Sequence, residues 1–73
     1  MKDLRIQYLD RYGKMQYESY KTIMEFTDFI EENPKHPINY GHHVRAEFFE
    51  NCNHVKYFDT ITHLYDFCIA IMK

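Results

Sequence analysis

The amino-acid sequence predicts a small α+β domain, in which duplicated β-β-α units form one four-stranded antiparallel sheet with two helices packed on one face. Three observations lead to this prediction: an internal repeat, an alternation of apolar and polar residues with period two, and helical periodicity after each alternating stretch. The 73 residues are expected to form a single domain, with a first unit at 1–33, a linker at 34–43 and a second unit at 44–73.

The repeat is clearest around the two helical segments. Residues 20–30 match residues 58–68 in register, because both contain an aromatic residue, Thr-Ile and a later Asp-Phe. Residues 8–15 match residues 48–55, so that Gly13 aligns with Asn53. Glycine and asparagine adopt positive φ most readily, and the last position of a short hairpin loop with a bulge requires it. Each unit is therefore expected to begin with a tight hairpin.

Alternation defines the strands. The apolar positions of the two clearest strands are Leu4, Ile6 and Tyr8, and then Val44, Ala46 and Phe48. In residues 15–20, Met15, Tyr17 and Ser19 alternate with Gln16, Glu18 and Tyr20, and in residues 54–58, Val55 and Tyr57 alternate with His54, Lys56 and Phe58. Because an isolated hairpin is barely stable in water, the two hairpins are expected to join into one sheet.

The first helix is expected from about Ile23 to Glu32. Thr22 followed by Glu25 is a capping-box pattern, and Asn33-Pro34 is a stop signal. The second helix is expected to start near Asp59 or Thr60 and to continue almost to residue 73. Residues 33–43 contain both prolines and one of the two glycines, as expected of a linker.

The outer face of the first helix is purely anionic: it consists of Glu25, Asp28, Glu31 and Glu32. Residues 20–33 add one cation, Lys21. Negative charge near a helix C-terminus opposes the macrodipole, so stability alone would not favour this arrangement. Two interpretations stay open: a solvated face that keeps the protein soluble, or a contact for a basic surface of another protein.

The second helix has an apolar arc that is wider than one sheet face needs. Either this helix is wedged between the sheet and the first helix, or part of it packs against a second subunit. A homodimer would supply burial that a chain of this length lacks. Its expected contact is the flank formed by Tyr65, Ile69 and Met72.

Composition excludes several classes of protein. Hydrophobic residues make up 45% and aromatic residues 18% of the chain, which excludes disorder. A formal charge of −2 excludes a broad basic field, and no apolar run is long enough to span a membrane. No apolar signal segment follows Met1, so we expect a cytoplasmic protein whose Cys52 and Cys68 are reduced thiols.

No catalytic or metal-binding pattern is recognisable. The candidate ligands His36, His42, His43 and His54, with Cys52, include neither a C-x2-C pair nor two histidines at i,i+4. Cys52 lacks an orienting partner that can be named, and the two glycines are isolated, so no phosphate-binding loop can be drawn. We therefore expect no enzyme activity, no metal and no cofactor.

Aromatic side chains on the uncovered sheet face are the second candidate site. Tyr20, Phe49 and Phe58 are expected on that face, with Arg5, Arg45 and Lys56 nearby. Stacked bases would suit such a face, but its mixed charge makes nucleic acid a poor partner. Exposed tyrosine, phenylalanine and arginine more often mark a protein contact.

In general type, a tiny cytosolic domain rich in Tyr, Phe and His and without a catalytic constellation resembles the accessory proteins of phages and other mobile elements. The resemblance implies a non-enzymatic, anti-CRISPR-like inhibitor that blocks a host defence or nucleic-acid enzyme sterically. The acidic helix face would engage a basic groove of that host protein. The alternatives are a small nucleic-acid-binding or regulatory module that uses the open sheet face, and a structural homodimer.

Overall fold

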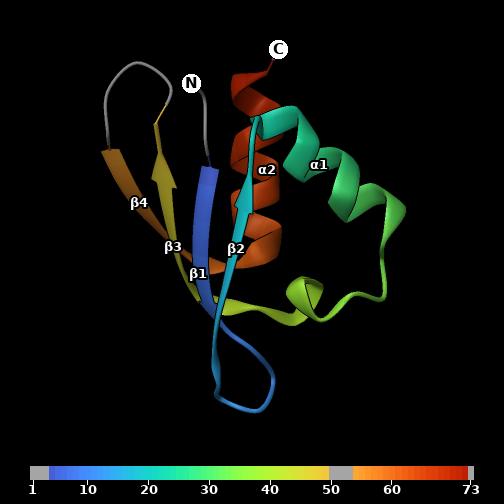
Figure 1. The fold of residues 1–73 in the computed structure, drawn as a ribbon, viewed down its shortest axis with the longest axis vertical. Coiled ribbons are helices and arrows are strands. Elements are labelled where there is room, and N and C mark those ends of the chain that lie inside the picture. Colours follow the sequence, from blue (N-terminus) through green and yellow to red (C-terminus); the bar gives the residue numbers. More distant parts are fainter. Residues whose placement is uncertain (1–3, 50–53, 73) are drawn as a thin grey trace.

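The computed structural model describes residues 4–49 and 54–72. Its elements, in chain order, are β1 (Leu4–Leu9), β2 (Met15–Tyr20), α1 (Ile23–Glu32), the 3-10 helix η1 (Pro37–Tyr40), β3 (His42–Phe48), β4 (His54–Thr60) and α2 (Ile61–Ile71). The four strands form one antiparallel sheet, with both helices on one side of it (Figure 1). The predicted α+β class is thus confirmed, whereas the duplication of the two units stays a prediction.

The strand order is β2-β1-β3-β4, so one strand from each unit meets at the centre of the sheet. β1 pairs with β3 in a register that places Leu4 opposite Phe48 and Ile6 opposite Ala46. Directly opposed residues of an antiparallel pair share a face, so the apolar positions of both strands lie together. The two hairpins therefore join through their most regularly alternating strands.

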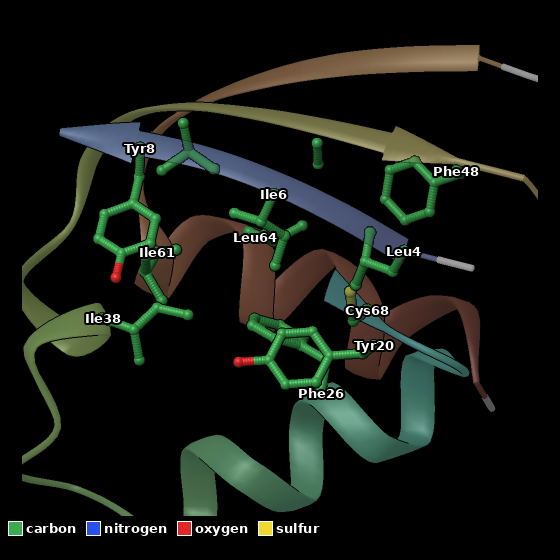
Figure 2. Close-up of a cluster of buried hydrophobic side chains, with 12 residues drawn as sticks. Leu4, Ile6, Tyr8, Tyr20, Phe26, Ile38, Phe48, Ile61, Leu64 and Cys68 are labelled. Carbon is green, nitrogen blue, oxygen red and sulfur yellow. The ribbon is translucent and has the colours of Figure 1, made fainter. Parts of the chain in front are cut away.

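One hydrophobic core fills the space between the sheet and the helices (Figure 2). Its buried apolar residues are Leu4, Ile6, Tyr8, Tyr20, Phe26, Ile38, Val44, Ala46, Phe48, Ile61, Leu64 and Cys68. Every element except β4 contributes a buried side chain to it. β4 instead packs the half-buried Phe58 against this cluster.

Both helices begin at a threonine cap. The Thr22 hydroxyl accepts a hydrogen bond from the Glu25 N–H at 3.0 Å, and the Thr60 hydroxyl accepts one from the His63 N–H at 3.3 Å. The Glu25 carboxylate reaches back to the Lys21 N–H at 3.5 Å, a long contact one residue before the cap. The predicted bounds of the first helix and its Thr22 cap are confirmed, whereas the Glu25 carboxylate contacts the N–H of Lys21 and not that of Thr22 as a capping box requires.

The first hairpin is closed by an aspartate turn. The Asp10 N–H donates to the Lys14 carbonyl at 2.8 Å, and Gly13 has a φ of 80°, as predicted for the last loop position. One Asp10 carboxylate oxygen accepts from the N–H groups of Tyr12 and Lys14, and the other accepts from the Gln16 amide at 3.0 Å. The aligned position, Asn53, lies outside the described residues.

α2 packs against β3, β4, η1 and α1. Its buried residues are Ile61, Leu64 and Cys68. The Tyr65 hydroxyl links the helices by donating a hydrogen bond to the Glu31 carboxylate at 2.6 Å. The buried part of the apolar arc is therefore shared between the sheet and the neighbouring helix, whereas packing of its exposed part, Ile71 and Met72, against a second subunit stays a prediction.

Gly41 marks the closest approach between the linker and the core. A Cβ atom at this position would lie 2.7 Å from Cδ2 of Tyr8 and 2.8 Å from Cγ1 of Ile61. The Gly41 carbonyl also accepts a hydrogen bond from the Ile61 N–H at 3.1 Å. The absence of a side chain here therefore lets the linker pass between β1 and the start of α2.

We predict that Gly41→Ala lowers the free energy of unfolding by about 1–3 kcal/mol, because the added methyl group overpacks the contact with Tyr8 and Ile61. Urea denaturation followed by circular dichroism measures the change. Gly13→Asn is the matched control: it has open space and a residue type that tolerates positive φ, so it should change stability by less than about 0.5 kcal/mol. An unchanged Gly41→Ala midpoint would contradict the tight contact.

We also predict that Asp10→Asn reduces the acid sensitivity of the domain. The hydrogen bond from the Lys14 N–H has the largest effect and lowers the pKa of Asp10, whereas desolvation, the next largest effect, raises it. The Gln16 amide and the Tyr12 N–H lower the pKa further, so that it lies below its ordinary value. A lowered folded pKa stabilises the fold above the unfolded pKa of about 3.9, and this contribution is lost as the pH falls through the folded pKa.

Urea unfolding at about pH 6 and pH 3 measures this effect. The parent should lose more stability on acidification than Asp10→Asn does. Asp28→Asn is the control, since the Asp28 side chain is exposed and makes no hydrogen bond within residues 4–49 and 54–72. Equal losses in the parent and in Asp10→Asn would show that the turn does not contribute to acid unfolding.

Candidate functional site

The acidic face, formed by Glu25, Asp28, Glu31 and Glu32, is exposed at all four positions. Phe26 and Thr27 are buried on the opposite side of α1 and hold the helix against the core. Within the described ranges, the one ion pair between side chains joins Arg45 to Glu47, at 3.8 Å. The four carboxylates are thus presented on a packed helix without a neutralising cation in that part of the chain.

Two of the four carboxylates also stabilise the domain. Glu25 completes the cap of α1, and Glu31 accepts the hydrogen bond from Tyr65. That hydrogen bond, with smaller effects of desolvation and nearby negative charge, raises the pKa of the Tyr65 phenol. Asp28 and Glu32 have no such contact among the described residues, and a separation of four places them next to each other on the helix. These two are the carboxylates best placed for an external partner.

The predicted positions of two aromatic residues were wrong. Tyr20 lies opposite Leu4 and Phe58 lies opposite Val44, so both face the helices. The Tyr20 ring is 8% exposed and packs edge-on against Phe26, with ring centroids 5.4 Å apart. Pairing with core residues of the central strands therefore decides the face of each edge strand.

Lys56 was also predicted on the open face and lies on the covered one, opposite Ala46. Its ammonium group is 5.4 Å from the centre of the Phe67 ring on α2. Phe49 lies where it was predicted, outside the core and beneath the Arg5 guanidinium at 4.9 Å. A cation-π contact of this kind orders both side chains on the open face.

The open sheet face presents two other tyrosines that the sequence analysis missed. Tyr17 and Tyr57 are 70% and 74% exposed. The strand register aligns Tyr17, Gln7, Arg45 and Tyr57 in one row across the sheet, hereafter the tyrosine row. The signal that was missed is the alternation of side chains along each strand. Because Tyr20 and Phe58 belong to the core, Tyr17 and Tyr57, at odd-numbered separations from them, project from the other face.

The tyrosine row crosses two shallow depressions. The first, of about 580 Å³, lies around Arg5, Gln7 and Tyr17, and the second, of about 390 Å³, lies around Arg45 and Tyr57. Glu47 lines the first depression and forms the ion pair with Arg45. The face therefore combines aromatic rings with charges of both signs and is not a basic surface.

The histidines have local contacts. His36 Nδ1 accepts a hydrogen bond from the Ile38 N–H at 3.1 Å, the His42 and His43 rings lie 5.1 Å apart, and His54 stacks on Phe48. In the described part of the chain, no group of three or more His, Cys, Asp or Glu residues is placed to hold a metal ion.

Cys68 is the cysteine that the structure describes, and it is buried in the core. Desolvation by burial raises the pKa of its thiol to about 12, so the thiol is protonated near neutral pH. Its place beside the apolar core residues agrees with a packing role. Cys52 lies outside the described residues.

The predicted dimer flank on α2 is partly used within the chain. Tyr65 and Ile69 are half-buried, and the Tyr65 hydroxyl is bonded to Glu31. Met72 is exposed, as is its neighbour Ile71. The dimer contact stays a prediction.

No protein-family model, curated protein or solved structure matches this chain. Over residues 4–49 and 54–72, no helix is both long and apolar enough to cross a membrane.

We predict that Tyr20→Phe leaves the domain as stable as the parent or up to about 1 kcal/mol more stable. The buried Tyr20 hydroxyl has no hydrogen-bond partner among the described residues, so its removal relieves a desolvation cost. Tyr20→Ala should instead lose about 3–5 kcal/mol by analogy with other buried aromatic residues. Urea denaturation compares the two variants, and a stable Tyr20→Ala would contradict a core role.

Proposed function

We propose that this protein is a non-enzymatic protein-binding domain that inhibits a nucleic-acid enzyme by occupying its basic groove. The observation that carries the proposal is the acidic face of α1. Its carboxylates project from a helix that the core holds in place, so their positions are largely set before binding. Preorganised charge of one sign speeds association with an oppositely charged groove and excludes the nucleic acid that would otherwise fill it.

The proposed target is a host defence enzyme with a groove for nucleic acid, such as a CRISPR effector, and the proposed location is the cytoplasm. Small size, a formal charge of −2 and the general resemblance to mobile-element accessory proteins support this choice. α1 lies at the side of the molecule next to the β2 edge, with α2 between it and β4 (Figure 1). This placement leaves the outer surface of α1 accessible to a large partner.

The second candidate function is a small nucleic-acid-binding or regulatory module. The observation that favours it is the tyrosine row, because exposed rings on a sheet can stack on unpaired bases. The pairing of Arg45 with Glu47 weakens phosphate binding at the centre of this row. Protein binding through the acidic face is therefore the better supported of the two functions.

The variant Asp28→Lys/Glu32→Lys tests the first proposal while keeping the cap at Glu25 and the contact at Glu31. Its matched control is Asp59→Lys/Asp66→Lys, which makes the same change in net charge at two exposed positions that do not belong to the acidic face. Nuclease-treated affinity capture from the native host lysate, with identification by mass spectrometry, is expected to recover one protein with the parent and the control. The Asp28→Lys/Glu32→Lys variant should lose it.

The captured protein is then purified and its binding to labelled nucleic acid is measured by fluorescence anisotropy. The parent domain is expected to displace the nucleic acid, more strongly at low salt than at high salt. Simultaneous binding of both ligands would contradict inhibition by occupation of the groove. A direct micromolar complex of the domain with single strands at physiological salt, lost in Tyr17→Ala/Tyr57→Ala, would favour the second function.

A further inference from the structure

A pocket of about 310 Å³ lies beside β2, where the first hairpin meets the segment before η1. It is separate from the acidic face of α1, and Glu18 at the β2 edge lines both this pocket and the first depression of the open sheet face. Its lining includes Tyr8, Asp10, Tyr12, Glu18 and His36. Polar groups with unused hydrogen-bonding capacity are concentrated here, although this is the covered side of the sheet.

The strand register explains why polar side chains reach this pocket. Gln16 lies opposite Tyr8 and Glu18 lies opposite Ile6, so both polar residues face the core side of the sheet. Tyr20, two residues further along β2, is covered by Phe26 of α1. The apolar core therefore occupies one end of this strand, and a half-buried polar surface occupies the rest.

Tyr8 supplies an unpartnered polar group. Its side chain is 1% exposed, and its hydroxyl makes no hydrogen bond to any residue that the structure describes. Figure 2 shows the hydroxyl end of the ring directed away from the sheet, toward η1. Burial, followed by the negative charges of Glu18 and Asp10, raises the pKa of this phenol.

Glu18 is the carboxylate available to a ligand. The two carboxylate oxygens of Asp10 accept hydrogen bonds from the turn and from Gln16. The half-buried Glu18 side chain, in contrast, has neither a hydrogen bond nor an ion pair among residues 4–49 and 54–72. The one cation at the pocket, Arg11, stacks on Tyr40 with its guanidinium carbon 4.4 Å from the ring centre. The pocket thus holds a carboxylate, a phenol and the exposed ring of Tyr12 without an internal cation bonded to Glu18.

We propose that this pocket binds an arginine side chain. A guanidinium group is planar and can donate two parallel hydrogen bonds to the Glu18 carboxylate and one to the Tyr8 hydroxyl. The Tyr12 ring is 79% exposed, and the Arg11 guanidinium carbon lies over it, 5.8 Å from the ring centre. The opposite side of this ring offers a face for stacking, which a guanidinium uses better than an ammonium group does. We take this arginine to be a side chain of the basic partner, and that step rests on the proposed function. The preference of the pocket for a guanidinium group does not rest on it.

The test is a titration of the intact ¹⁵N-labelled domain with N-acetyl-arginine methylamide, followed by amide chemical shifts. A single side chain of this size is expected to bind with a Kd on the order of millimolar, with the largest shifts in β2 and at His36. N-acetyl-lysine methylamide should bind several-fold more weakly. N-acetyl-glutamate methylamide should cause no shifts at these residues.

Glu18→Gln is expected to weaken arginine binding at least tenfold, and Tyr8→Phe several-fold, while both variants retain the folded spectrum. Glu47→Gln, which removes a carboxylate from the open face, should bind as the parent does, and so should Asp28→Lys/Glu32→Lys. Unchanged binding to Glu18→Gln, equal lysine binding, or shifts confined to another surface would overturn the proposal. Because no partner protein is present, these results are independent of capture through the acidic face.

Discussion

The pairing of β1 with β3 is the interaction on which the rest of the structure depends. Each strand alternates strictly, and their antiparallel register aligns the two apolar sets on one face of the sheet. Burial of this combined face provides most of the driving force that neither hairpin has alone. Both helices pack on the layer it creates, and Gly41 lets the linker approach closely enough to close one end of the core.

The edge strands follow from this central pair. Each is hydrogen-bonded to a core strand on one side, so its inward positions are chosen by register and not by its own hydrophobicity. On β2 this brings Tyr20 into the core but also turns Glu18 inward, where α1 no longer covers the strand. The same constraint that completes the core therefore creates a half-buried polar pocket beside it.

On α1, the same carboxylates form the proposed binding surface and, in part, stabilise the fold. Within the acidic face, Glu25 belongs to the helix cap and Glu31 joins the two helices through Tyr65. The repulsion among four neighbouring carboxylates is thus offset in part by contacts inside the domain. Asp28 and Glu32 have no such contacts in the described part of the chain, which separates charge that stabilises the fold from charge that is available to a partner. The acidic face and the polar pocket would both favour basic groups in the proposed partner.

The sequence by itself determined the α+β class, the helix bounds, the positive φ at Gly13 and the core positions of β1 and β3, because each depends on neighbours along the chain: a capping pattern, a turn residue or a strict alternation. The strand order and the inward faces of β2 and β4 depended on tertiary structure. These strands carry aromatic residues on both faces, such as Tyr17 and Tyr20, so alternation alone could not tell which face is buried. Only pairing with the central strands decided which face is buried. The same pairing decided which residues form the open face and the pocket.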